Sequence, residues 1–227
     1  MLRITWYGHA SFGIESESGI RLVTDPYDPN RSGYRSFPEQ ADIVIKSSSS
    51  DDGHNNDHLV PKKNGSRVVD ALEIAVSGKT ATSHGVTFRA IEAMEHEHHR
   101  DHNPDQNAMY RFSIDGLEVV HMGDMGNRLS SSQLDFLRGA DILLALAGGF
   151  PGIELHELKM TIDETKPRIV IPMHFRTLRY KFRNMHWIPE FLKYFSNDSI
   201  DFAFSCEAKI SKQDLPFDTR VLVLDYF

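Results

Sequence analysis

Cysteine is nearly absent from this sequence: among 227 residues there is one, Cys206. A single thiol excludes an internal disulfide and a zinc site made of several cysteines, and it fits a reducing cytoplasm. Long hydrophobic runs are also missing. The best stretch, 141–150, has about half of the ~20 residues that a membrane helix needs and contains two glycines. The first residues lead directly into an alternating pattern rather than a signal peptide. We therefore expect a cytoplasmic protein without a membrane segment.

Positive charge is in deficit as well, because 25 lysines and arginines stand against 32 aspartates and glutamates, for a net charge of -7. A chain of this sign lacks the general attraction to phosphate backbones on which most nucleic-acid-binding proteins depend. Nucleic acid is therefore not an expected partner, whereas a small-molecule substrate is. Hydrophobic residues (40%) and charged residues (25%) are in the proportions of a globular protein. Since no linker or repeat divides the chain, residues 1–227 are expected to form one domain.

The hydrophobic pattern begins as β and becomes mixed α/β. Asp115-Gly116, between two alternating segments, predicts a hairpin with a two-residue turn. Later in the chain, short apolar runs predict strands buried on both faces, separated by helices. Half-buried strands are expected at 2–6, 11–15 and 20–23, buried strands at 42–45, 142–146 and 169–171, and helices at 130–138, 155–165 and 187–195.

Polar side chains that can bind a metal follow several of the expected strands. His9 comes after the first strand, Asp124 comes just after His121 at the end of another, and His174 follows the buried strand 169–171. Each has an ordinary structural explanation: a turn histidine, a helix-capping aspartate and a buried, hydrogen-bonded histidine. Their shared placement, in a chain with 12 histidines, instead suits a divalent metal held by nitrogen and oxygen ligands.

Two histidine-rich segments add further candidates. His54 and His58 are four residues apart, which is the spacing of one helical face. Segment 95–102 contains Glu95, His96 and three more histidines. Polar runs of this kind are usually solvated loops, so we expect one or two of these histidines at most to be ligands.

Six short motifs together resemble the metallo-β-lactamase superfamily. They occur in the order and at the spacings of that family, over roughly residues 1–180, and within it they are most similar to the small metal-dependent hydrolases that include the phosphorylated-ascorbate lactonases. The resemblance implies an α/β fold, a four-layer αββα sandwich with its site at the sheet edge between the two halves. The motifs are WYGHASF (6–12), VTDP (23–26), ADIVI (41–45), HMGD (121–124), GG (148–149) and PMHF (172–175).

The chain departs from the resemblance in the loop that supplies most of the family's ligands. There, an H-x-H-x-D-H motif follows the strand matched by 42–45 and serves both metals. Aligned on that strand, this sequence has Ser48, Ser50 and Gly53 at the three histidine positions and keeps only Asp52. A serine hydroxyl is a poor zinc ligand. A one-residue bulge at Gly53 would restore an aspartate–histidine pair with His54.

The resemblance assigns the remaining ligands by position. Asp124 matches the bridging aspartate, His174 matches the last histidine, and Glu95, with His96 beside it, stands where the family has another histidine. Asp51 is a further candidate near the lost positions. Asp52 could also orient the attacking water, and His9 could contact the substrate or leaving group. The expected metal is zinc, with manganese or iron as alternatives. The expected ligands are Asp52, His54, Glu95, His96, Asp124 and His174.

Three functions remain open at this point. The first is a hydrolase that uses a metal-bound hydroxide on a small ester, lactone or phosphoester. The second is a non-catalytic protein of the same fold that has lost its metals and binds a ligand or partner, as the serines would suggest. The third is a metal-binding or sensing protein that uses the histidines of 96–102. The basic residues within 176–183 would form either an anion-binding edge or a solvated loop.

Overall fold

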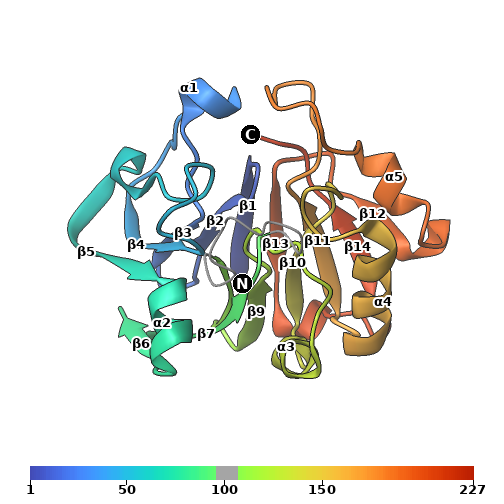
Figure 1. The fold of residues 1–227 in the computed structure, drawn as a ribbon. Coiled ribbons are helices and arrows are strands. Elements are labelled where there is room, and N and C mark those ends of the chain that lie inside the picture. The colour runs from blue at the N-terminus through green and yellow to red at the C-terminus, as the bar shows by residue number, and fades with distance from the viewer. Residues whose placement is uncertain (96–106) are drawn as a thin grey trace.

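The computed structural model describes residues 1–95 and 107–227. Within these residues, two β-sheets face each other across a shared core (Figure 1). The smaller sheet has the spatial order β13 (Glu207–Ile210), β1 (Leu2–Gly8), β2 (Ser11–Glu15), β3 (Arg21–Thr24), β4 (Ala41–Lys46) and β5 (Lys62–Asp70). The larger sheet has the order β12 (Ile200–Phe202), β14 (Arg220–Val223), β11 (Ile169–Met173), β10 (Ile142–Leu146), β9 (Leu117–His121), β8 (Asn107–Ile114), β7 (Val86–Ala93) and β6 (Ala81–Ser83).

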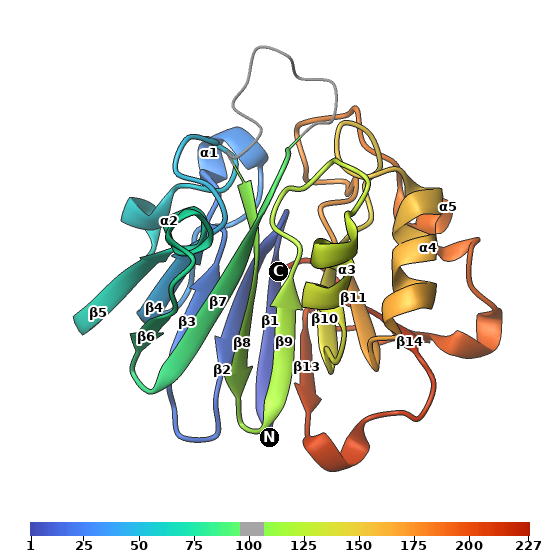
Figure 2. The ribbon, with the colours of Figure 1, turned by 60° about the horizontal axis from the view of Figure 1, so that its bottom comes forward.

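The helices are short and lie mainly outside the larger sheet. Figures 1 and 2 show α3, α4 and α5 on its outer side, and α3 packs against α4. The helix α2 instead contacts β7 and β8 of the larger sheet and β4 of the smaller one. No helix in the described ranges is long and apolar enough to cross a membrane. The bounds are α1 (Pro29–Ser32), α2 (Ala71–Ser77), α3 (Ser131–Leu137), α4 (Leu155–Thr165) and α5 (Ile188–Leu192).

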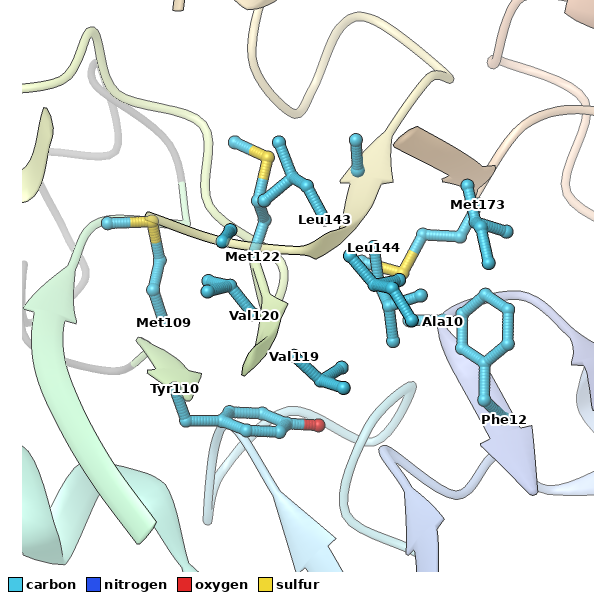
Figure 3. Close-up of a cluster of buried hydrophobic side chains, with 14 of the residues drawn as sticks. Ala10, Phe12, Met109, Tyr110, Val119, Val120, Met122, Leu143, Leu144 and Met173 are labelled. Atoms are coloured by element: carbon cyan, nitrogen blue, oxygen red, sulfur yellow. The ribbon is translucent and has the colours of Figure 1, made fainter. Parts of the chain in front are cut away.

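The main core lies between the sheets and continues under the outer helices. In β3 and β4, Leu22, Ile43 and Ile45 face this core, whereas Val23 and Val44 face the opposite side, as the two-residue repeat of a strand requires. All residues of β10 and β11 are buried, because the sheet is covered on both faces there. Figure 3 shows Phe12 of the smaller sheet in one apolar cluster with Leu144 and Met173 of the larger sheet.

Aromatic side chains cover the outer face of the smaller sheet. Tyr27, Tyr34 and Phe37, from the segment between β3 and β4, pack on one another and on Tyr7 of β1. The only helix in that segment is α1, with four residues. The expected four-layer α/β sandwich is therefore confirmed, although the outer layer on this side is mainly loop.

Local signals account for most of the element boundaries. The capping box of Ser130 and Gln133 starts α3, and α4 has the expected bounds. Asp115 and Gly116 both have positive φ, as the predicted hairpin turn requires. The helix expected at 187–195 is shorter and ends at Leu192. The elements α2 and β13 were not expected, because α2 directly follows a strand and β13 is a four-residue strand at a sheet edge.

A matched pair of leucine substitutions tests where the core lies. Leu144 is fully buried and Leu178 is 85% exposed. We expect Leu144→Ala to lower the free energy of unfolding by about 2–5 kcal/mol, since it leaves a cavity between packed layers. Leu178→Ala should change it by less than about 0.5 kcal/mol. Urea denaturation measures both, and equal effects would contradict the assignment of the core.

Candidate metal centre

Side chains from five strand ends meet at one edge of the two sheets. His9 follows β1, Asp25 follows β3 and segment 47–54 follows β4, while Asp124 follows β9 and His174 follows β11. The helix α1 and the segment between β11 and α5 lie at this same end of the molecule (Figure 1). They enclose a cavity of about 280 Å3, with metal-binding side chains around it. Other residues that line the cavity include Arg31, Asp52, Tyr180, Phe182 and Asn184.

The imidazole of His54 is held in one orientation by Asp25. Its Nδ1 lies 2.8 Å from Asp25 Oδ2, and both side chains are buried. The Asp25 carboxylate also accepts hydrogen bonds from the Ser47 backbone N–H (2.9 Å), the Ser47 hydroxyl (2.5 Å) and the Tyr110 hydroxyl (3.0 Å). Because the carboxylate is paired with Nδ1, the other ring nitrogen of His54, Nε2, faces the cavity. A carboxylate behind a histidine is the usual support of a metal-binding imidazole.

Two aspartates face the free nitrogen of His54. Its Nε2 lies 3.4 Å from Asp124 Oδ2 and 3.6 Å from Asp51 Oδ2. The other oxygen of Asp124, Oδ1, lies 3.4 Å from His174 Nε2. One atom from each of Asp51, His54 and Asp124 falls within 4.8 Å of the others, and the same is true of His9, His54 and His174. The two groups share His54.

Within residues 1–95 and 107–227, three imidazole nitrogens at this edge are buried without a hydrogen-bond partner. They are His9 Nδ1, His54 Nε2 and His174 Nε2. The ring of His9 lies 4.0 Å from that of His174 and 4.6 Å from that of His54, measured between centroids. A buried polar atom without a partner is costly in free energy, so three of them around one cavity indicate a ligand-binding site.

The backbone conformation also indicates that this edge is a functional site. His9, Asp25 and His174 adopt φ values of 54°, 35° and 58°, which are unfavourable for residues other than glycine. The backbone N–H of His174 donates to the His9 carbonyl (2.9 Å), as does the indole N–H of Trp6 (3.0 Å). Strained residues of this kind gather at functional sites, where the surrounding structure holds them in place.

Two glycines allow the close backbone contacts that position Asp124 and His174. Gly123 has φ 64°, and a Cβ there would lie 2.6 Å from the Ala108 carbonyl oxygen, so the turn that delivers Asp124 requires glycine. A Cβ on Gly148 would clash with the carbonyl oxygen of His174. The side-chain oxygen of Asn107 also accepts the backbone N–H of Asp124 at 3.1 Å.

The charges of the centre are strongly coupled. Burial alone would raise the pKa of Asp124, but the imidazoles of His174 and His54 hold it far below its usual value. Burial would lower the pKa of His54, yet Asp51 and Asp124 raise it well above the ordinary value. Burial and then repulsion from Asp124 raise the pKa of Glu95 to about 7, and the same two causes raise the pKa of Asp51. A bound cation would relieve this crowding of carboxylates.

The other two histidines are suited to metal binding in a different way. Burial lowers the pKa of His174 and lowers that of His9 well below its ordinary value, with the neighbouring imidazoles adding to the effect at His9. Both rings are therefore neutral at physiological pH, which is the form that binds metal ions.

The structure brings most of the expected ligands together, but not all of them. His54, Asp124 and His174 meet at the centre, and Glu95 lines the same cavity. The side chain of Asp52 is 75% exposed and forms an ion pair with Arg31 at 2.6 Å, with its neighbour Asp51 at the centre instead. His96 lies outside the described residues. His58 is exposed rather than on a face shared with His54.

A shift of one residue explains the exchange of Asp52 for Asp51. When the H-x-H-x-D-H pattern is placed one residue later, its last histidine falls on His54 and its second histidine falls on Asp51. His54 was the available signal for this register. Asp25 was missed as a functional residue, although it stands in the VTDP motif directly after a buried strand.

The sequence and the fold are similar to those of known proteins. A profile of the β-lactamase superfamily domain matches residues 3–174. The chain belongs to this superfamily. A UPF0173 protein of Pyrococcus abyssi is 29% identical to it over 190 residues, which cover 78% of this chain and 84% of the relative. A UPF0173 metal-dependent hydrolase of Archaeoglobus fulgidus is 24% identical over 204 residues, with the same shares covered.

A solved structure extends the likeness of this β-lactamase superfamily protein to the whole chain. A proposed zinc-dependent hydrolase of the metallo-β-lactamase superfamily from Thermotoga maritima has 30% identity and a TM-score of 0.77, and the match covers 100% of both chains. The narrower resemblance to the phosphorylated-ascorbate lactonases stays a prediction.

The residues at the centre fit a metal ion. One group supplies three imidazoles and the other supplies His54 with the carboxylates of Asp51 and Asp124, which is the donor chemistry that zinc, iron and manganese accept. Asp25 provides the outer support that such ligands need.

The role of Asp25 can be tested by substitution. We expect Asp25→Asn to lower the affinity of the protein for zinc by about 10–100-fold, because His54 loses the acceptor that fixes its tautomer. Competition with a chromophoric chelator measures the affinity. Asp42→Asn, at the start of β4 and paired with Lys63 at 2.7 Å, is the matched control and should leave it unchanged. Unaltered zinc affinity in a folded Asp25→Asn protein would remove Asp25 from the centre.

Proposed function

We propose that this protein is a metal-dependent hydrolase that acts on a small ester, lactone or phosphoester. The observation that carries the proposal is the convergence of three buried, unpartnered imidazole nitrogens and Asp124 on one cavity. Relatives named metal-dependent hydrolases and the likeness to a proposed zinc-dependent hydrolase support it. We further propose zinc as the main metal and the cytoplasm as the compartment.

His9, His54, His174 and Asp124 would hold the ion. When bound, it would lower the pKa of a coordinated water toward 7 and polarise the substrate oxygen. The protein's own contribution is to keep the ligands in place before substrate arrives: Asp25 fixes His54, and the His9 carbonyl fixes the backbone of His174. This preorganisation avoids a reorganisation cost during the reaction.

The rest of the cavity limits what can enter. Tyr180 packs on His9 with ring centroids 5.0 Å apart and is itself buried, so it closes one side of the site. Phe182 lies next to Tyr180 and is partly exposed at the wall. Arg31 is half-exposed and paired with Asp52, where it can meet a negative group on the substrate. A cavity of about 280 Å3 with these walls suits a small and in some cases anionic molecule.

One observation favours the non-catalytic alternative. Ser48, which stands at a histidine position of the family only in the alignment without the one-residue shift, is buried and its hydroxyl accepts the backbone N–H groups of Ser50 and Asp51. The serine therefore stabilises its own loop and does not replace a ligand. A protein that binds no metal and still folds would fit this alternative.

Elemental analysis of protein purified without chelator or histidine tag tests the proposal. We expect about one or two equivalents of zinc, manganese or iron. His174→Ala should lose most of this metal, since it removes a buried ligand, whereas His58→Ala, which changes an exposed histidine, should keep it. Asp124→Ala should abolish hydrolysis in a screen of lactones and phosphodiesters. Folded protein without metal would overturn the proposal in favour of a ligand-binding descendant.

A further inference from the structure

The nitrogen and oxygen atoms that could bind a metal are not evenly distributed around the centre. His9 and His174 lie on one side with ring centroids 4.0 Å apart, and His9 is linked to no carboxylate in the described part of the chain. Asp51 lies on the other side with Asp124 and His54, and Glu95 lines the same cavity. One side is therefore rich in nitrogen and the other in oxygen.

Two residues are placed between these sides. Asp124 Oδ1 lies 3.4 Å from His174 Nε2, and Asp124 Oδ2 lies 3.4 Å from His54 Nε2, so its two oxygens face different histidines. His54 belongs both to the group of three histidines and to the group with Asp51 and Asp124. Such an arrangement can serve two ions with shared ligands.

A second observation, besides the acidic residues, supports a cation position on the oxygen-rich side. The side chain of His54 is 1% exposed, and its Nε2 faces Asp51 and Asp124 with no hydrogen-bond partner among the residues that the structure describes. Within the described residues that line the cavity, the basic side chain is Arg31, and its recorded ion pair is with Asp52 rather than with Asp51. Within the described residues, neither Asp51 nor Asp124 has a recorded ion pair with a lysine or arginine, and a cation would satisfy both carboxylates and His54.

From this division we infer that the centre is a mixed-metal site, in which a nitrogen-rich position takes a zinc-like ion and an oxygen-rich position, at Asp51 and Asp124 with Glu95 in the wall of the same cavity, takes a hard divalent cation such as Mn2+. The inference rests on the proposed function. Its basis is that imidazole suits zinc and iron, whereas carboxylate oxygens suit magnesium, calcium and manganese. The substitution of serines and acidic residues in the loop would then change metal selectivity rather than abolish binding.

Metal titration tests the inference without reference to catalysis. Protein stripped with a chelator is first loaded with about one equivalent of zinc, and Mn2+ is then added while the electron paramagnetic resonance signal of free Mn2+ is recorded. We expect about one equivalent of Mn2+ to bind to the zinc-loaded protein and the zinc to stay bound.

Adjacent aspartates provide a matched pair of variants. Asp51→Asn keeps size and shape but removes a charged ligand of the oxygen-rich position, so the affinity for Mn2+ should fall at least ~10-fold while the zinc equivalent remains. Asp52→Asn changes an exposed residue paired with Arg31 and should leave both metals unchanged. Glu95→Gln should act as Asp51→Asn does. Circular dichroism and thermal melting check that each variant folds.

The outcomes separate this inference from the proposed function. If the second equivalent is zinc, with no Mn2+ uptake, or if Asp51→Asn and Asp52→Asn bind Mn2+ equally well, the mixed-metal site is wrong and the metal-dependent hydrolase stands. If the stripped wild-type protein folds but takes up neither metal, the proposed function fails as well.

Discussion

The backbone hydrogen bond from the His174 N–H to the His9 carbonyl joins the two halves of the molecule at the edge where the metal centre lies. It connects the turn after β1, in the smaller sheet, to the end of β11, in the larger one. Both residues have positive φ, a conformation that costs free energy and that packing must maintain. Because each residue carries a candidate ligand, any relaxation of this contact would move two imidazoles at once.

Behind the centre lies a polar network inside an apolar core. Asp25 binds His54, Ser47 and Tyr110, and Tyr110 stacks on His121 with ring centroids 4.7 Å apart. His121 in turn donates to the Ala10 carbonyl and accepts the Gly123 N–H, so it has a structural role and not a ligand role. Hydrogen bonds of this kind are strong where the dielectric constant is low, but each group must be satisfied. The satisfied network makes the unpartnered nitrogens in front of it more significant.

The loop after β4 departs from the family's metal-binding motif, whereas the strands around the site are retained. Ser48 caps its own loop, Asp51 enters the centre and Asp52 turns outward to Arg31. The superfamily frame, the strand ends and Asp124 with His174 are retained. We therefore interpret the substitutions as a change in what the centre binds, which the charge distribution favours over simple loss of the site.

The sequence by itself determined the fold class, because alternation, buried runs, caps and the spacing of six motifs are local properties that survive in the final structure. It also predicted Asp124 and His174 as ligands, through the family positions that they match, and His54, through a bulge at Gly53, and the structure places all three around one cavity. It could not decide between Asp51 and Asp52, because neighbouring residues in a loop point in different directions only once the loop is packed. Asp25 and the orientation of His9 likewise depend on contacts between residues far apart in the chain, so only the tertiary structure decided them.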